Sequence, residues 1–252
     1  RLLNKVAIVT GSTDGIGYSI AEKFLKEGSK VVICSRKSKN VNYAIEKLKQ
    51  SYNPNNLRGI VCHVGEIEAR KKLISETVES FGRIDILVSN AATNVHFGPI
   101  LECSEDAWDK IFHTNLKSAF FLIKEASPHF NNNASIIINS SISGFNPFPM
   151  LGIYSITKTA LIGMVKVLSQ ELANDPLRIR VNGIAPGIIK TKFSRALYEN
   201  EAIHEEFKNQ LHLKRFGTGE DCAGLVAFLA SDEAAYITGE TVVVAGGLFS
   251  RL

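Results

Sequence analysis

A tyrosine and a lysine four residues apart are the first pair in this sequence that could do chemistry. Tyr154 and Lys158 lie in a segment of helical periodicity, residues 151–172, so their side chains should emerge on one helix face about one turn apart. An ammonium group beside a phenol stabilises the phenolate and lowers the phenol pKa from its usual value of about 10. Tyr154 could then act as a proton donor or acceptor. Because Tyr and Lys meet at this spacing on many helices by chance, further residues are needed.

Residues that follow two predicted strands supply them. Ser141 comes directly after the apolar run at 135–140, and Asn90, Ala91 and Ala92 come directly after the run at 86–89. Asn115 lies in an earlier helical stretch. Ligands bind at the carboxyl edge of a parallel sheet. We therefore expect these residues to converge with Tyr154 on one rim.

A glycine-rich loop follows the first predicted strand and precedes a helical pattern at 18–27. It consists of Gly11, Ser12, Thr13, Asp14, Gly15, Ile16 and Gly17. Backbone N–H groups in such a loop approach a pyrophosphate closely, and the helix N-terminus adds partial positive charge. The G-x-x-x-G-x-G spacing differs from the common G-x-G-x-x-G motif, and an ordinary tight turn is the alternative. The strand before it and the helix after it favour a phosphate site.

Ser35, Arg36 and Lys37 follow the second predicted strand. A cofactor with a free ribose 2′-hydroxyl would normally meet an Asp or Glu there. A guanidinium offers paired, charged donors to the 2′-phosphate of NADP and gains little from the hydroxyl of NAD. The residues therefore favour NADP(H), although Arg36 could also be a solvated loop charge.

Apolar strand-like runs alternate with helical stretches along the whole chain. The strand candidates are residues 6–9, 31–34, 59–64, 86–89, 135–140, 180–184 and 241–245. Strands joined by helices pair in parallel through right-handed crossovers, which predicts one α/β domain with a doubly wound sheet. The polar stretches 52–56 and 131–133 are predicted to be loops. A longer insertion at about 191–216 is either a surface helical hairpin or a lid over a ligand.

Composition excludes several classes of protein. The 252 residues are 45% apolar and 21% charged, as in soluble globular proteins. No run approaches the roughly 20 apolar residues of a membrane span. The net charge is +4, from 29 basic and 25 acidic residues that are interspersed, which argues against nucleic acid binding. The start of the chain shows no secretion signal, and the four cysteines are too scattered for a metal site or a disulfide framework.

Together these motifs resemble the classical short-chain dehydrogenase/reductase family over nearly the whole chain. The motifs are the glycine loop, Asn90-Ala91-Ala92, Asn115, Ser141, Tyr154-x-x-x-Lys158 and Pro186-Gly187. The resemblance implies a Rossmann-type sheet of seven strands in the order 3-2-1-4-5-6-7. It implies that Tyr154 donates a proton to a substrate carbonyl and that Lys158 lowers the Tyr154 pKa and binds the nicotinamide ribose. Ser141 would bind the carbonyl oxygen, and Asn115 would hold a water in a proton relay.

Further cofactor contacts are implied at other strand ends. They are Asn90 at the ribose, Pro186, Gly187, Ile188 and Thr191 at the nicotinamide, and His63 and Val64 at the adenine. His63 departs from the family pattern, because many members carry an Asp there that accepts a hydrogen bond from the adenine amine. A neutral imidazole can accept through one nitrogen. The implied substrate pocket is lined by Thr93, Asn94, Ser141, Ile142, Phe148, Leu151 and Phe193.

Three runs are similar to a peroxisomal branch of the family that reduces carbonyl compounds and retinal with NADPH. They are residues 12–17, residues 62–65 and the final Ser250-Arg251-Leu252. The last run resembles the S-K-L signal that a peroxisomal import receptor reads. Members of this branch are mostly homotetramers, which implies the same here. The expected reaction is NADPH-dependent reduction of ketones, α-dicarbonyls or retinal to alcohols. The alternatives are an NAD-linked hydroxysteroid or retinol dehydrogenase and a non-catalytic nucleotide-binding protein.

Overall fold

A single parallel sheet of seven strands organises the computed structural model, which describes residues 1–174, 176–195 and 201–248. The strand order is β3-β2-β1-β4-β5-β6-β7, and every pairing is parallel. The strands are β1 (Val6–Val9), β2 (Lys30–Ser35), β3 (Leu57–Val61), β4 (Ile84–Ser89), β5 (Phe130–Asn139), β6 (Arg180–Pro186) and β7 (Thr241–Val244). The predicted single-domain Rossmann-type fold and its strand order are confirmed. All the strands therefore end at one edge.

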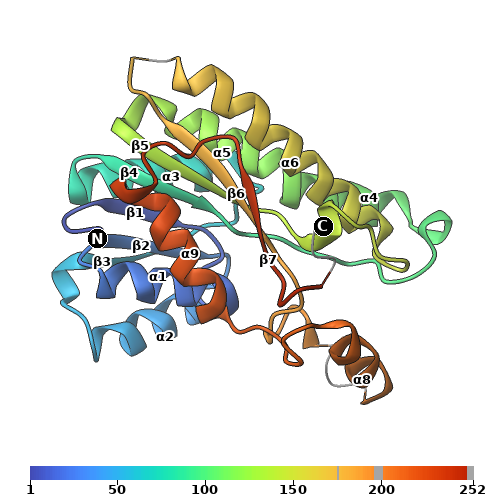
Figure 1. Ribbon diagram of the computed structural model, residues 1–252. Coiled ribbons are helices and arrows are strands. Elements are labelled where there is room, and N and C mark those ends of the chain that lie inside the picture. Colours follow the sequence, from blue (N-terminus) through green and yellow to red (C-terminus); the bar gives the residue numbers. More distant parts are fainter. Residues whose placement is uncertain (175, 196–200, 249–252) are drawn as a thin grey trace.

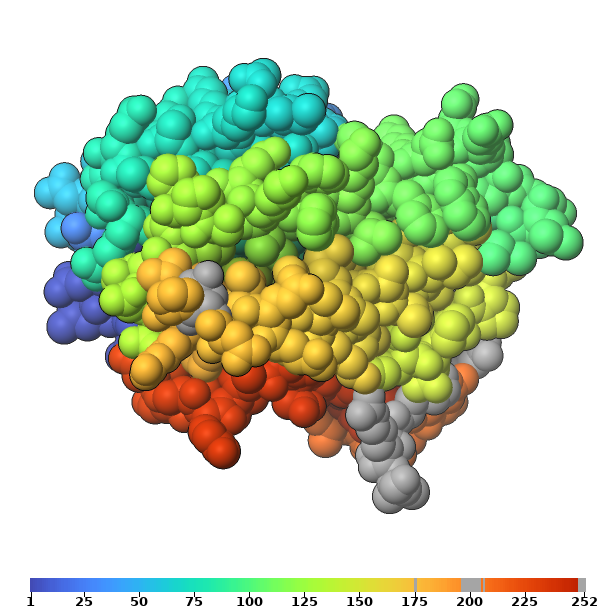
Figure 2. Space-filling view, turned by 90° about the horizontal axis from the view of Figure 1, so that it is seen from above, coloured from blue at the N-terminus to red at the C-terminus, as the bar shows by residue number. Residues whose placement is uncertain are grey.

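Helices cover both faces of this sheet (Figure 1). One face carries α1 (Gly15–Lys26), α2 (Ser38–Lys49) and α9 (Gly219–Ala230). The other carries α3 (Ile67–Phe81), α5 (Ser118–Ala126) and the long α6 (Gly152–Ala173), with α4 (Glu105–Phe112) packed against α6. Figure 2 shows α3, α5 and α6 side by side on that second face.

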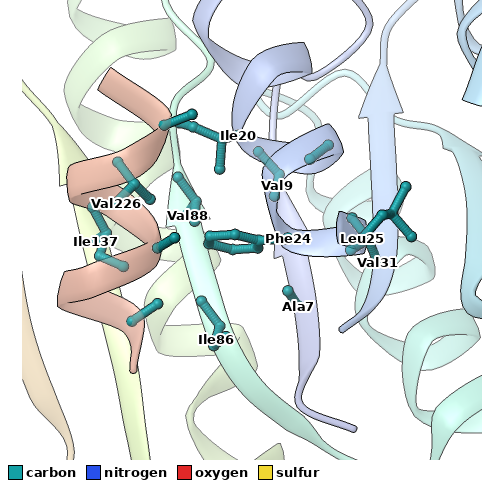
Figure 3. Close-up of a cluster of buried hydrophobic side chains, with 14 of the residues drawn as sticks. Ala7, Val9, Ile20, Phe24, Leu25, Val31, Ile86, Val88, Ile137 and Val226 are labelled. Atoms are coloured by element: carbon teal, nitrogen blue, oxygen red, sulfur yellow. The ribbon is translucent and has the colours of Figure 1, made fainter. Parts of the chain in front are cut away.

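The hydrophobic core is divided between the two faces because consecutive strand residues point in opposite directions. In β1, Ala7 and Val9 join the cluster under α1 and α9, whereas Ile8 joins the cluster under α3, α5 and α6. Phe24 of α1 is fully buried in the first cluster, close to Val88 of β4 (Figure 3). Burial on both faces explains why the strands are continuous apolar runs.

The stretch 131–133 is part of β5, so the prediction of a loop there is wrong. Its polar groups have partners: Asn131 Nδ2 donates to Asp85 Oδ1 at 2.8 Å, and the Asn133 N–H donates to the Leu177 carbonyl at 2.7 Å. The register between β4 and β5 is irregular at this end of the strand. Polar residues can therefore extend a strand where partners distant in the sequence replace the apolar pattern.

The insertion after β6 contains the helix α8 (Glu201–Gln210). Residues 196–200 of the proposed lid lie outside the described residues, as do the side chains of residues 201–204 and 206. Two apolar side chains of its far end, Leu211 and Phe216, are buried against Ile142 and Ile188. Within the described parts of the chain, no helix is both long enough and apolar enough to span a bilayer.

Candidate active site

The glycine loop connects β1 to α1. At Gly17 it packs so closely that there is no room for a side chain. A Cβ added at Gly17 would lie 2.5 Å from both the Gly11 carbonyl oxygen and Asn90 Nδ2. Gly11 has a positive φ of 60°, which favours glycine. The side chain of Asp14 caps α1 by accepting from the Gly15 N–H at 2.8 Å. The loop thus exposes the positive end of a 12-residue helix at the carboxyl edge of the sheet.

Ser35 ends β2 beside this loop, and the two segments are joined by hydrogen bonds. The Ser12 N–H donates to the Cys34 carbonyl at 3.1 Å, and the Cys34 N–H donates to Ser12 Oγ at 3.0 Å. Arg36 and Lys37 follow as exposed side chains. An anion bound at the α1 N-terminus would therefore have a guanidinium and an ammonium group within the next loop.

Asn90, directly after β4, links the loop to the centre of the sheet. Its Nδ2 donates to the carbonyls of Thr10 at 2.8 Å and Gly11 at 3.2 Å, and its Oδ1 accepts from Asn139 Nδ2 at 2.7 Å. Asn139 ends β5 two residues before Ser141 and was not predicted as a site residue. Its position at the end of an apolar strand was the available signal.

Ser141, Tyr154 and Lys158 are brought together as predicted. The Ser141 side chain lies near enough to the Tyr154 hydroxyl to lower the phenol pKa through a hydrogen bond, and Ser141 Oγ accepts from the Ser143 N–H at 3.1 Å. Lys158 Nζ lies 5.4 Å from the centre of the Tyr154 ring. Thus a hydroxyl, a phenol and an amine meet where β5 ends beside α6.

The electrostatics of this group differ from the prediction. Burial raises the pKa of Tyr154 to about 12, against the lowering effect of the Ser141 hydrogen bond. Burial also lowers the pKa of Lys158 to about 7, because the ammonium is removed from water. Lys158 is only 2% exposed, and its Nζ donates to the Asn139 carbonyl at 2.8 Å. The expected lowering of the phenol pKa by Lys158 is therefore absent in this state of the protein.

Asn115 lies in a π-helical turn, His113–Lys117, between α4 and α5. Its amide accepts from the Thr93 N–H at 2.7 Å, and donates to the Thr93 carbonyl at 2.9 Å and to Thr157 Oγ1 at 3.2 Å. Thr157 Oγ1 in turn donates to the Tyr154 carbonyl at 2.7 Å. The Asn115 side chain therefore positions Thr93 and the start of α6, and its role in holding a water stays a prediction.

The predicted nicotinamide contacts lie at the end of β6. The Gly187 N–H donates to the Val244 carbonyl at 2.9 Å, which fixes the chain just after Pro186. A Cβ added at Gly15 would lie 2.9 Å from the Thr191 methyl group, so the start of the insertion reaches the glycine loop. Lys192 Nζ also forms an exposed ion pair with Asp14 Oδ2 at 2.7 Å, a contact that the sequence did not indicate.

The predicted substrate residues lie close to Tyr154 in space or in sequence, and Phe193 contacts it directly. The rings of Phe193 and Tyr154 are 5.7 Å apart, and Phe193 remains 55% exposed. Ile142 is buried in a cluster with Ile188, against which Phe148 packs. Leu151 precedes α6, and its carbonyl accepts from the Ser155 N–H at 2.8 Å. Asn94 Oδ1 is buried without a recorded hydrogen-bond partner in the described chain.

His63 and Val64 follow β3, next to the end of β2. The Cys62 N–H donates to the Ser35 carbonyl at 3.0 Å, which keeps this segment beside Ser35. His63 Nδ1 accepts from the Gly65 N–H at 3.2 Å. The ring nitrogen that could have accepted from an adenine amine is thus already occupied.

The sheet order and this edge of strand ends define a nucleotide-binding α/β oxidoreductase fold, and comparisons with known proteins agree. A family model described as enoyl-(acyl carrier protein) reductase matches residues 11–249. Dehydrogenase/reductase SDR family member 4 of Sus scrofa is 48% identical over 253 aligned residues, covering 100% of this chain and 89% of that protein.

Two further matches extend this result. Tropinone reductase-like 3 of Erythroxylum coca is 48% identical, covering 100% of this chain and 96% of that protein. A crystal structure of a short-chain glucose/ribitol dehydrogenase from Brucella melitensis has a TM-score of 0.93 at 31% identity, covering 99% of this chain and 98% of that chain. The chain belongs to the short-chain dehydrogenase/reductase family and is an oxidoreductase of that family.

The buried amine gives a testable dependence of stability on pH. The pKa of Lys158 is about 7 in the folded protein and near 10.5 when unperturbed. Between these values the unfolded chain holds the extra proton, so this residue makes wild-type stability rise by up to about 1.4 kcal/mol per pH unit. Lys158→Met lacks this dependence. Its free energy of unfolding should exceed that of the wild type most below pH 7, and the excess should shrink toward pH 10.5.

Urea unfolding at about pH 6, 8 and 10 measures this difference. Tyr154 is present in both proteins, so its own titration cancels in this difference. Lys166→Met, at an exposed position of the same helix, is the matched control and should show no such trend. A difference between Lys158→Met and the wild type that stays constant with pH would contradict the lowered Lys158 pKa.

Proposed function

We propose that this protein reduces ketones, α-dicarbonyls or retinal to alcohols with NADPH. The observation that carries the proposal is the meeting of Ser141, Tyr154 and Lys158 at the sheet edge that also holds the glycine loop. NADPH would supply the hydride. The residues that would hold it are the glycine loop for the pyrophosphate, Arg36 for the 2′-phosphate, and Lys158 with Asn90 near the nicotinamide ribose.

The chain's own residues would handle the proton and the developing charge. Tyr154 would give its hydroxyl proton to the carbonyl oxygen as the hydride reaches the carbonyl carbon, so that C=O becomes CH–OH. Ser141 would donate a hydrogen bond to the same oxygen while negative charge develops on it. A Tyr154 pKa of about 12 keeps the phenol protonated at neutral pH. In this state the phenol is therefore in the form that can donate a proton, as reduction needs.

Exposed aromatic surface beside the phenol supports substrates with a hydrophobic body. Phe193 lies against Tyr154 and remains 55% exposed, and Phe148 is half-buried where it packs against the cluster of Ile142 and Ile188. Such a surface offers few polar anchors. The names of the relatives, a member of the SDR family and a tropinone reductase-like protein, are compatible with carbonyl substrates.

We further propose a homotetramer. Large apolar side chains that a monomer would leave exposed lie on α4, α5 and α6: Trp108, Phe120, Ile156 and Val167. Burying such a face between subunits would stabilise an assembly. Sedimentation equilibrium tests this assembly, and a monomer at micromolar concentration would contradict it.

We also propose peroxisomal import through Ser250, Arg251 and Leu252, which lie outside the described residues and resemble the S-K-L signal. A fluorescent fusion should lose peroxisomal location when these three residues are deleted from a free C-terminus. Unchanged location would contradict this role.

Replacing Arg36 should change cofactor preference. Arg36→Asp removes a charge-assisted contact to the 2′-phosphate and adds repulsion, so the KM for NADPH should rise by about 10- to 100-fold. The KM for NADH, which lacks that phosphate, should change little. Steady-state kinetics with both cofactors measures this, and Lys26→Asp, at an exposed position in the last turn of α1, controls for the charge change. Equal effects on both cofactors would count against the assignment of Arg36.

Removing the phenolic hydroxyl should separate binding from turnover. Tyr154→Phe keeps the ring that contacts Phe193 but has no proton to donate, so kcat should fall by about 100- to 10,000-fold. The Kd for NADPH, measured by calorimetry, should stay within about threefold of the wild type, a small change on the scale of one hydrogen bond. Tyr236→Phe, at a fully exposed position, is the control. Retained turnover would refute the role of Tyr154.

A further inference from the structure

We propose that His63 recognises the cofactor base as a hydrogen-bond donor, so that this site tolerates hypoxanthine in place of adenine. The inference rests on the proposed binding of a dinucleotide at the sheet edge. Many family members carry an Asp at this position, and its carboxylate accepts a hydrogen bond from the adenine amine. In this chain we assign a hydrogen-bond donor to the same position.

The sheet order places the base beside His63. With the pyrophosphate at the glycine loop after β1 and the ribose phosphate at Arg36 after β2, the base must lie farther out along the same edge, toward β3. The segment after β3 is held there by the hydrogen bond from the Cys62 N–H to the Ser35 carbonyl. His63 is the next residue and is partly buried.

A single backbone hydrogen bond fixes the tautomer of His63. The Gly65 N–H can only donate, so His63 Nδ1, 3.2 Å away, must be the unprotonated nitrogen of the ring. A neutral imidazole with a free lone pair on Nδ1 carries its hydrogen on Nε2. Among the described residues, no hydrogen-bond partner is recorded for Nε2. The unused polar atom of the ring is therefore an N–H donor.

The ring is held in this orientation by its neighbours. The Gly65 carbonyl accepts from His113 Nε2 at 3.0 Å, so Gly65 is engaged on both sides. A Cβ at Gly65 would lie 2.7 Å from His113 Nε2 and 3.1 Å from His63 Cε1, which shows how closely the two rings flank this glycine. Turning the His63 ring over would put a carbon in place of Nδ1 and break the bond to the Gly65 N–H.

A donor at this point cannot select the adenine amine. The edge of adenine carries a donor at N6 and acceptors at N1 and N7. In hypoxanthine the group at position 6 is the acceptor O6, N1 carries a hydrogen, and N7 remains an acceptor. An Nε2–H group can pair with a ring nitrogen of adenine and with O6 or N7 of hypoxanthine. A carboxylate, in contrast, pairs with the N6 amine and is repelled by O6. A carboxylate therefore discriminates between the two bases, whereas an N–H donor accepts both.

Calorimetry of the full-length protein with NADP⁺ and with its hypoxanthine analogue tests the proposal. The wild type should bind the two with Kd values within about threefold of each other. In His63→Asp the analogue should bind at least about tenfold more weakly than NADP⁺, because a buried acceptor then faces O6. Any general repulsion between the new carboxylate and the cofactor phosphates affects both Kd values equally and cancels in their ratio.

Two further variants act as controls. His63→Asn, whose amide can donate or accept, should keep the ratio near that of the wild type, and His129→Asp makes the same charge change at an exposed position on the α3–α5 face. Nitrogen-15 NMR of the unliganded protein should show His63 with a protonated Nε2 and an unprotonated Nδ1.

Discrimination of more than tenfold by the wild type, an unchanged ratio in His63→Asp, or the opposite tautomer would each overturn the proposal. If NADP⁺ does not bind but NAD⁺ does, the NADP assignment fails, and NAD⁺ with its hypoxanthine analogue then gives the same ratio. If no dinucleotide binds, both proposals fail.

Discussion

The side-chain amide of Asn90 joins the two halves of the site. It holds the carbonyls of Thr10 and Gly11 with its nitrogen and accepts from Asn139 with its oxygen, and the Asn139 carbonyl accepts from Lys158. Asn90 is partly buried, and an amide withdrawn from water is costly unless its groups are paired. Its hydrogen bonds therefore constrain the positions of Thr10, Gly11 and Asn139. The shape of the glycine loop and the depth of Lys158 in the site are thereby linked through the ends of β1, β4 and β5. The glycine loop and the buried amine of Lys158 thus share one edge of the sheet.

The fold could be predicted from the sequence because strands that are buried on both faces are continuous apolar runs. Each strand core was found, since continuous apolar runs bounded by helices leave few topologies open. The error at 131–133 has a physical cause. Asn131 is stabilised in β5 by Asp85, a residue 46 positions away, and no local pattern encodes a partner at that distance. Strand length, unlike strand existence, depended on contacts that only the folded chain makes.

In the site, too, sequence spacing determines which side chains meet, whereas the packed surroundings determine their pKa values. The approach of Tyr154 to Lys158 follows from helix geometry and was predicted correctly. The pKa of Tyr154 was not, because desolvation depends on everything packed around the phenol and here raises its pKa, while Lys158, itself desolvated, is largely neutral where a phenolate would form. His63 shows a related limit. Its residue type allowed either polarity, and only the neighbouring Gly65 N–H decides which nitrogen keeps the proton.

The first residues of the insertion contact both the glycine loop and Tyr154. Lys192 pairs with Asp14 on the glycine loop, and Phe193 lies against Tyr154. The ion pair is exposed, and such pairs contribute at most about 1 kcal/mol because water and salt screen them. The aromatic contact is also incomplete, since more than half of Phe193 remains exposed. These two contacts alone therefore contribute little to the stability of the start of the insertion.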